Sequence, residues 1–151
     1  GDHRDLHSFP TRRSSDSMLA EWIGIRKDLE SRKQQLSGED LSNLKLMEAE
    51  LDNAKLKEAD LSTTYLIRAN LSGADLSGAD LSNAVLAEAN LTGANFSETE
   101  MLDTWLNGAD LSGAVNLTCD QIEDANIDRD TKLPDYIKIS WNDNGTFDCS
   151  T

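Results

Sequence analysis

The feature that most constrains this chain is an apolar residue, usually leucine, that recurs every five positions through its middle half. On an α-helix, a period of five places successive leucines about 140° apart around the axis, so no apolar stripe forms. On a flat strand, an odd period sends them alternately to opposite faces. Both regular elements are therefore excluded, and the pattern indicates a chain that turns a corner within every unit.

Two positions before each of these residues stands a small residue, mostly alanine, with threonine as a substitute. Fifteen such units follow one another between residues 39 and 113 without an insertion. Residues two apart on a short extended segment face the same side, so both should point inward. We expect the solenoid core to contain Leu41, Leu46, Leu51, Leu56, Leu61, Leu66, Leu71, Leu76, Leu81, Leu86, Leu91, Phe96, Met101, Leu106 and Leu111.

Glycine and asparagine are frequent two positions after the leucine, where a corner can require a positive φ. Gly73, Gly78 and Asn83 are examples. Units with a charged corner residue, such as Glu58 and Glu88, are expected to use a different turn type.

The units ANLSG, ADLSG, ADLSN, ANLTG and ANFSE, taken from residues 69–98, resemble the A(D/N)Lxx units of the pentapeptide-repeat family. The resemblance implies an all-β fold, a right-handed quadrilateral β-helix with four units per coil and hence about four coils. Its interior would be filled by the stacked leucine and alanine side chains. No catalytic, metal or cofactor-binding residue is expected, and the chain is not expected to be an enzyme.

The flanking segments lack this period. Residues 1–16 resemble translated sequencing-adapter sequence, and we expect a disordered leader that is not native. Residues 17–38 are expected to form an amphipathic helix, either a lid over the first coil or a helix that binds a partner or a second copy. Residues 39–116 would form the solenoid, and residues 117–151 a C-terminal cap and tail.

Within the cap, the apolar residues expected to cover the last coil are Leu117, Ile122, Ile127 and Leu133. The two cysteines, Cys119 and Cys149, match no metal-ligand spacing, and the sequence does not decide whether they pair.

If four units make one coil, outward residues twenty apart stack into four faces that differ in charge. One face carries acidic residues and no basic residue among its outward positions. We call Asp40, Asp60, Asp80, Glu100 and Asp103 the acidic face, a candidate interaction surface. A neighbouring face balances its charges and is rich in apolar residues. We call Met47, Tyr65, Ile67, Val85 and Trp105 the apolar wall, a candidate docking surface for residues 17–37, a second copy or another partner.

The net charge of −14 argues against direct binding of nucleic acid. We expect a protein partner with a basic surface, and the sequence leaves open whether the chain forms a homodimer. No apolar run is long enough to span a membrane. The expected function is a non-enzymatic interaction or structural module in the cytoplasm. The alternative is a DNA mimic that regulates or protects a type II topoisomerase such as DNA gyrase, as some members of the family do.

Overall fold

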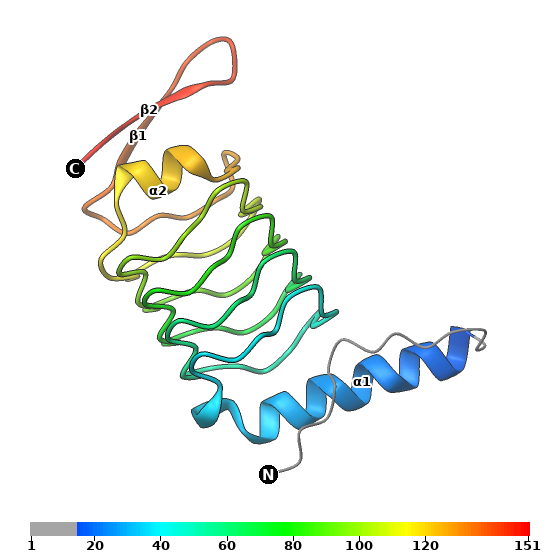
Figure 1. Ribbon diagram of the computed structural model, residues 1–151. Helices are drawn as coiled ribbons and strands as arrows, with labels where there is room; N and C mark the ends of the chain where they lie inside the picture. The colour runs from blue at the N-terminus through cyan, green and yellow to red at the C-terminus, as the bar shows by residue number, and fades with distance from the viewer. Residues whose placement is uncertain (1–14) are drawn as a thin grey trace.

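The computed structural model describes residues 15–151, and the expectation for residues 1–14 lies outside this range. The order of elements is α1 (Ser15–Ser31), η1 (Lys33–Gln35), the repeat region, α2 (Cys119–Asp124), β1 (Lys138–Trp141) and β2 (Phe147–Ser150). The repeats form a stack of coils with α1 across one end and α2 with the β1–β2 hairpin at the other (Figure 1).

Each coil takes twenty residues, because the parallel bridges join positions twenty apart, as in Asn70↔Asn90. The N–H of Leu71 donates to the Asn90 carbonyl at 2.7 Å, and the N–H of Asn90 donates back to the Ala69 carbonyl at 2.9 Å. Only one extended residue per unit takes part in such a bridge, so the repeat region contains no long strand. Four five-residue units therefore close one period of this ladder.

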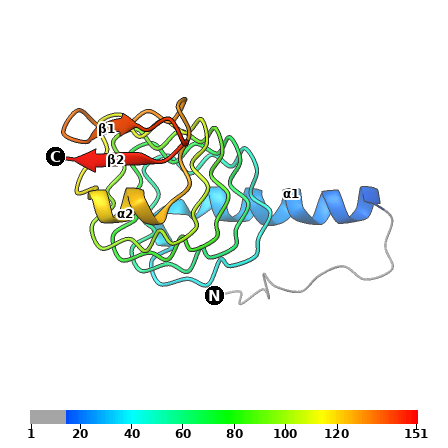
Figure 2. The same cartoon turned by 90° about the horizontal axis from the view of Figure 1, so that it is seen from above.

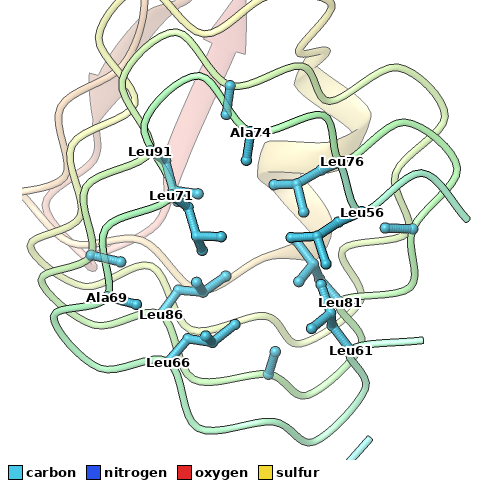
Figure 3. Close-up of a cluster of buried hydrophobic side chains, with 14 of the residues drawn as sticks. Leu56, Leu61, Leu66, Ala69, Leu71, Ala74, Leu76, Leu81, Leu86 and Leu91 are labelled. Carbon is cyan, nitrogen blue, oxygen red and sulfur yellow. The ribbon is translucent and has the colours of Figure 1, made fainter. Parts of the chain in front are cut away.

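All fifteen of the leucine-position residues between 41 and 111 are buried, and their side chains are at most 2% exposed. In Figure 3, Leu56 and Leu76 stack on one side of the interior, and Leu71 and Leu91 stack on another. These side chains point toward a shared axis, together with the alanines two positions before them. The interior is thus a stack of leucine and alanine ladders.

Threonines at the alanine position are also buried, and each hydroxyl bonds to a backbone carbonyl of the preceding coil. The pairs are Thr64 to Leu41 at 2.8 Å, Thr99 to Leu76 at 2.7 Å and Thr104 to Leu81 at 2.7 Å. A hydroxyl without a partner would be costly in this apolar interior. The substitution of alanine by threonine is therefore accommodated by the backbone.

Every corner uses the same turn, and the expectation that Glu58 and Glu88 turn differently is wrong. Glu58 has φ +61° and Glu88 has φ +59°, close to the +68° of Gly73. The N–H of Glu58 donates to the Ser77 carbonyl at 2.9 Å, and the next N–H closes the turn at 3.0 Å. Placing a residue with a side chain in the left-handed backbone conformation costs about 1–2 kcal/mol. The two hydrogen bonds, of about 1 kcal/mol each, offset this cost.

The N-terminal helix differs from its predicted range, since it begins at Ser15 and ends at Ser31. The chain leaves the helix because Leu36, fully buried, already occupies a leucine position of the solenoid. Gly38, at φ +73°, makes the first corner and donates its N–H to the Lys57 carbonyl at 2.9 Å. The sequence Leu36-Ser37-Gly38 is the same as that of residues 71–73 in the repeat region. This identity is the sequence signal that residues 36–38 belong to the solenoid and not to the helix.

Helix α1 runs under the first coil and occupies backbone groups that would otherwise face solvent. The N–H of Glu50 donates to the Glu30 carboxylate at 2.6 Å, and just after the helix the Lys33 carbonyl, in η1, accepts from the N–H of Lys55 at 2.8 Å. Trp22, Ile25 and Leu29 are buried in the same core cluster as the coils. The helix therefore closes the end of the solenoid.

The other end extends farther than residue 116, because bridges continue from Trp105 to Asn126 and from Asp110 to Lys132. The extra residues of this last coil accommodate α2, whose Ile122 is fully buried. Leu117 is buried as well, while Ile127 and Leu133 are partly buried against the core.

Side chains replace missing backbone partners in this irregular coil. The Asp128 carboxylate accepts from the N–H of Gly108 at 3.0 Å, and the Gln121 amide donates to the carbonyls of Phe96 at 2.8 Å and Thr99 at 3.0 Å. Burial by itself raises the pKa of Asp128. Hydrogen bonds from Gly108 and Thr131 outweigh it, so the pKa of Asp128 lies below its ordinary value.

A disulfide between Cys119 and Cys149, with Cα atoms 5.7 Å apart, ties the start of α2 to β2. Strands β1 and β2 pair antiparallel, with Trp141 opposite Phe147. The pairing of the cysteines, which the sequence left undecided, fastens the hairpin to the cap.

Candidate interaction surfaces

The acidic face is a vertical row, because bridges connect Asp40 to Asp60, Asp60 to Asp80 and Asp80 to Glu100 in successive coils. Adjacent coils lie about 4.8 Å apart, so carboxylates of like charge stand close together. Asp103 lies at a corner of the same face, with φ +56° and an exposed side chain. The structure brings all five together, and their role in binding stays a prediction.

Part of this row also has a local structural role. The Oδ1 atom of Asp60 accepts from the N–H of Ser62 at 3.0 Å and from its hydroxyl at 2.6 Å. Asn70 makes the same two contacts with Ser72 at 3.1 and 2.8 Å. The pattern of aspartate or asparagine two residues before serine is the sequence signal for this turn, and the expectations from sequence did not include it. One carboxylate oxygen suffices for the turn, and asparagine serves equally.

The cap extends the acidic face. An open hollow of about 760 Å³ lies between the last coils and α2, and Glu98, Glu100 and Asp124 contribute acidic groups to its lining. The N–H of Asp103 donates to the Asp124 carbonyl at 2.9 Å, which fixes this edge. Because Asp124 lies outside the five-residue period, its place beside Glu100 follows only from the tertiary structure.

Basic residues of the N-terminal segment partly balance acids near the first coil. Arg32 contacts Glu39 at 3.4 Å and Asp28 at 3.0 Å. Lys33 contacts Asp52 at 2.8 Å, and its hydrogen bond lowers the pKa of that carboxyl group. The end of the solenoid next to α1 is therefore less acidic than the part of the acidic face near the cap.

The apolar wall is exposed, and α1 does not cover it. Met47, Tyr65 and Trp105 are 38%, 44% and 46% exposed, and Ile67 and Val85 are half-buried. The expectation that residues 17–37 cover this wall is wrong, because the helix packs on the end of the solenoid instead. A charged row borders the wall, where Arg68 lies between Glu48 at 3.4 Å and Glu88 at 3.5 Å.

Among residues 15–151, no group of three or more histidine, cysteine, aspartate or glutamate side chains is placed to hold a metal ion. Within that same part of the chain, no helix is long and apolar enough to cross a membrane.

The comparisons with known proteins come from a family model and from solved structures. The family model "Pentapeptide repeats" matches in eight copies, over residues 35–62, 45–83 and 74–113. No curated protein gives a significant match. The match begins close to Leu36, in agreement with the early start of the solenoid.

A pentapeptide repeat protein from Nostoc PCC 7120 is 32% identical over 80% of this chain and 88% of its own length, with a TM-score of 0.52. The protein Rfr23 from Cyanothece 51142 is 31% identical over 60% of this chain, with a TM-score of 0.41, and the match spans 64% of that protein. QnrB1, a plasmid-mediated fluoroquinolone resistance protein, is 20% identical over 67% of this chain and 61% of its own length, with a TM-score of 0.46.

The family model covers more than half of the chain, and the Nostoc relative shares both the repeat and the right-handed β-helix solenoid. The chain belongs to the pentapeptide-repeat family.

Proposed function

We propose that this protein is a non-enzymatic interaction module whose acidic face binds a basic surface of another protein. The observation that carries the proposal is the stacked carboxylate row from Asp40 to Glu100, continued at the cap by Asp124. A row of like charges focuses the field and raises the encounter rate with a basic partner. The hollow beside Glu100 has the acidic lining that an arginine or lysine side chain of the partner would need.

The arrangement of the faces supports this proposal. We infer a quadrilateral β-helix of about four coils with an N-terminal helix and a C-terminal cap, since the ladder repeats every twenty residues. In such a shape the acidic face and the apolar wall point in different directions and can engage different partners. The filled interior offers no enclosed site for a small substrate, which favours binding over catalysis.

The location in the cell belongs to the same proposal. The cytoplasm was the expectation from sequence, but the Cys119–Cys149 bond is of a type that persists mainly in oxidising compartments. This bond therefore argues against the cytoplasm.

The test is a pair of variants that each replace two carboxylates by uncharged amides and keep the corner turns. Asp60→Asn with Asp80→Asn removes two charges from the acidic face, and asparagine at Asn70 already makes the same turn. The matched control, Glu50→Gln with Asp110→Asn, removes two charges from another face. Proteins captured from lysate by the wild type would be purified and titrated against all three forms.

We expect basic partners whose affinity falls in the acidic-face variant and stays unchanged in the control, with a steep dependence on salt. Equal binding by all three forms would contradict the proposal.

The alternative, a DNA-mimicking topoisomerase regulator, has one observation in its favour. The stacked carboxylates form a regular line of negative charge along the solenoid, as phosphates do along a duplex. The likeness to QnrB1 carries no weight here, because 20% identity shows the fold alone. Supercoiling by DNA gyrase in the presence of the purified protein tests this alternative. An effect that the acidic-face variant abolishes would replace the main proposal.

A further inference from the structure

Helix α1 is longer than the coil that it covers. Its contacts run along the first coil, from Glu30 at the N–H of Glu50 to Arg26 at the Met47 carbonyl, 3.3 Å away. A further contact in this direction places the Lys45 ammonium 5.7 Å from the centre of the Trp22 ring. Lys45 and Met47 both belong to the face of the apolar wall, so the helix crosses the edge of that face near Trp22.

The N-terminal part of α1 projects beyond the coils, as both cartoon views show (Figures 1 and 2). Residues 17–20 are all exposed, including Met18 at 36% and Leu19 at 59%. We call the segment from Ser15 to Glu21 the overhang. Seven residues of helix span about 10 Å. The overhang and the apolar wall together form a shelf, to which the overhang adds the exposed side chains of Met18 and Leu19.

The depth of this shelf equals the distance between two packed β-layers, which is also about 10 Å. A β-layer placed on the apolar wall would therefore reach the tip of the overhang without colliding with it. The wall itself has a flat footprint of about 300 Å², from four coils about 4.8 Å apart and five residues of about 3.3 Å each. This footprint is well below the roughly 800 Å² per partner of a standard interface, so the wall alone would support only a weak dimer, and contacts of the overhang add to it.

The charge of the molecule favours a second copy as the occupant. A chain with a net charge of −14 repels its own copies, except at a face where the charges balance. The apolar wall is such a face, with Lys45 and Arg68 beside Glu48 and Glu88. A basic partner would be drawn to the acidic face instead. Exposed aromatic residues such as Tyr65 and Trp105 are the side chains that most often anchor protein interfaces.

The charged row also fixes the orientation of the two copies. If the copies pack antiparallel with the whole wall in contact, the twofold axis lies between the coils of Tyr65 and Val85. Arg68 of each copy then faces Glu88 of the other, and the ion pairs form twice. If the copies pack parallel along this row, Arg68 faces Arg68, which is repulsive.

We propose that this protein forms an antiparallel homodimer through the apolar wall and the overhang of α1, with Arg68 of each copy paired to Glu88 of the other. The wall supplies the centre of the interface. Each overhang closes one end of it by reaching across to the last coil of the other copy. This inference is independent of the proposed role of the acidic face, which stays open to solvent in the dimer.

Sedimentation velocity of the chain over about a hundredfold range of concentration tests the proposal, since mass action makes the dimer fraction depend on concentration. We expect a dimer for the wild type and at least a tenfold weaker association for Trp105→Glu and for Leu19→Glu. Leu102→Glu is the matched control, because Leu102 is 57% exposed on the acidic face. This variant should dimerise like the wild type.

A charge exchange gives the most specific result. Arg68→Glu alone and Glu88→Arg alone should each weaken self-association, since like charges meet across the axis. An equimolar mixture of the two variants should form a heterodimer. The introduced glutamate of one variant then faces the introduced arginine of the other, and the remaining native Glu88 and Arg68 face each other at the second contact.

A wild type that stays monomeric at every concentration would overturn the proposal. So would a dimer that Trp105→Glu and the charge exchange leave unchanged. Neither result bears on partner capture by the acidic face.

Discussion

The position of a leucine within the five-residue unit should decide how much the chain loses when that leucine is shortened. Leu76 is fully buried at the leucine position, and it stacks over Leu56 in Figure 3. Leu102 follows the leucine position directly and is 57% exposed. Both residues belong to the same solenoid, so Leu76→Ala and Leu102→Ala form a matched pair.

The structure sets the magnitude. Replacing a buried leucine by alanine costs about 3–5 kcal/mol, and the cost rises with the cavity that remains. Phe96 lies one coil farther along the same row and is also fully buried. The hydrogen-bond ladder holds the coils on both sides at a fixed spacing, so the cavity at Leu76 cannot collapse. We therefore expect a loss in the upper part of this range, a large share of the stability of a single domain.

Urea unfolding followed by circular dichroism measures the difference. With a slope of about 2 kcal/mol per molar urea, the midpoint should fall by about 2–2.5 M for Leu76→Ala. For Leu102→Ala the free energy of unfolding should change by no more than about 0.5 kcal/mol. A loss below about 1 kcal/mol for Leu76→Ala, or equal losses for both variants, would refute the assignment of leucine positions to the axis.

Three further outcomes follow from the polar contacts of the coils and the cap. Thr99→Val removes the hydroxyl that donates to the Leu76 carbonyl, and it should lower the free energy of unfolding by about 1–2 kcal/mol in urea titration. Thr92→Val removes a hydroxyl that bonds to the Asn90 side chain at 2.7 Å where water can replace it, so the change should be no more than about 0.5 kcal/mol. Asp128 has a lowered pKa in the folded state, so its contribution to stability is present above the unfolded pKa of about 4 and is lost as pH falls through the folded pKa. Asp128→Asn should therefore flatten the acid limb of a plot of stability against pH, and an unchanged limb would contradict the role of this carboxylate. Reduction of the Cys119–Cys149 bond, which spans 30 positions, should lower stability by about 3–4 kcal/mol in the chain-entropy account; thermal unfolding with and without reductant measures this, and Cys149→Ser should then show no response to reductant.

Much of the acidic face and of the apolar wall could be predicted, because their residues recur with the same five-residue period as the core. Once Leu61 and Leu81 share an axis, Asp60 and Asp80 must project from the same face one coil apart. The same argument places Tyr65 beside Val85 on the apolar wall. A period of five fixes which residues point outward, and the twenty-residue coil fixes which of them are neighbours.

The expectations that failed concern contacts that the sequence of a single unit does not reveal. Glu58 and Glu88 adopt the same turn as glycine, because the ladder between coils supplies hydrogen bonds that a single-residue preference does not reveal. Leu36 fits a helix by sequence because apolar residues at helical spacing precede it. Its burial inside the first coil shows that the packing of the coil outweighs helical propensity.

The sequence by itself determined the interior of this protein and the division of its surface into faces. A repeat carries this information because each unit meets the same neighbours in the next coil, so local rules apply fifteen times over. Only the tertiary structure decided the two ends. There the chain leaves the repeat, and single contacts such as Lys33 to Lys55, Leu117 to Tyr136 and Cys119 to Cys149 replace the ladder. Such contacts do not keep the twenty-residue separation of the ladder, and only the folded arrangement of the backbone brings their residues within reach.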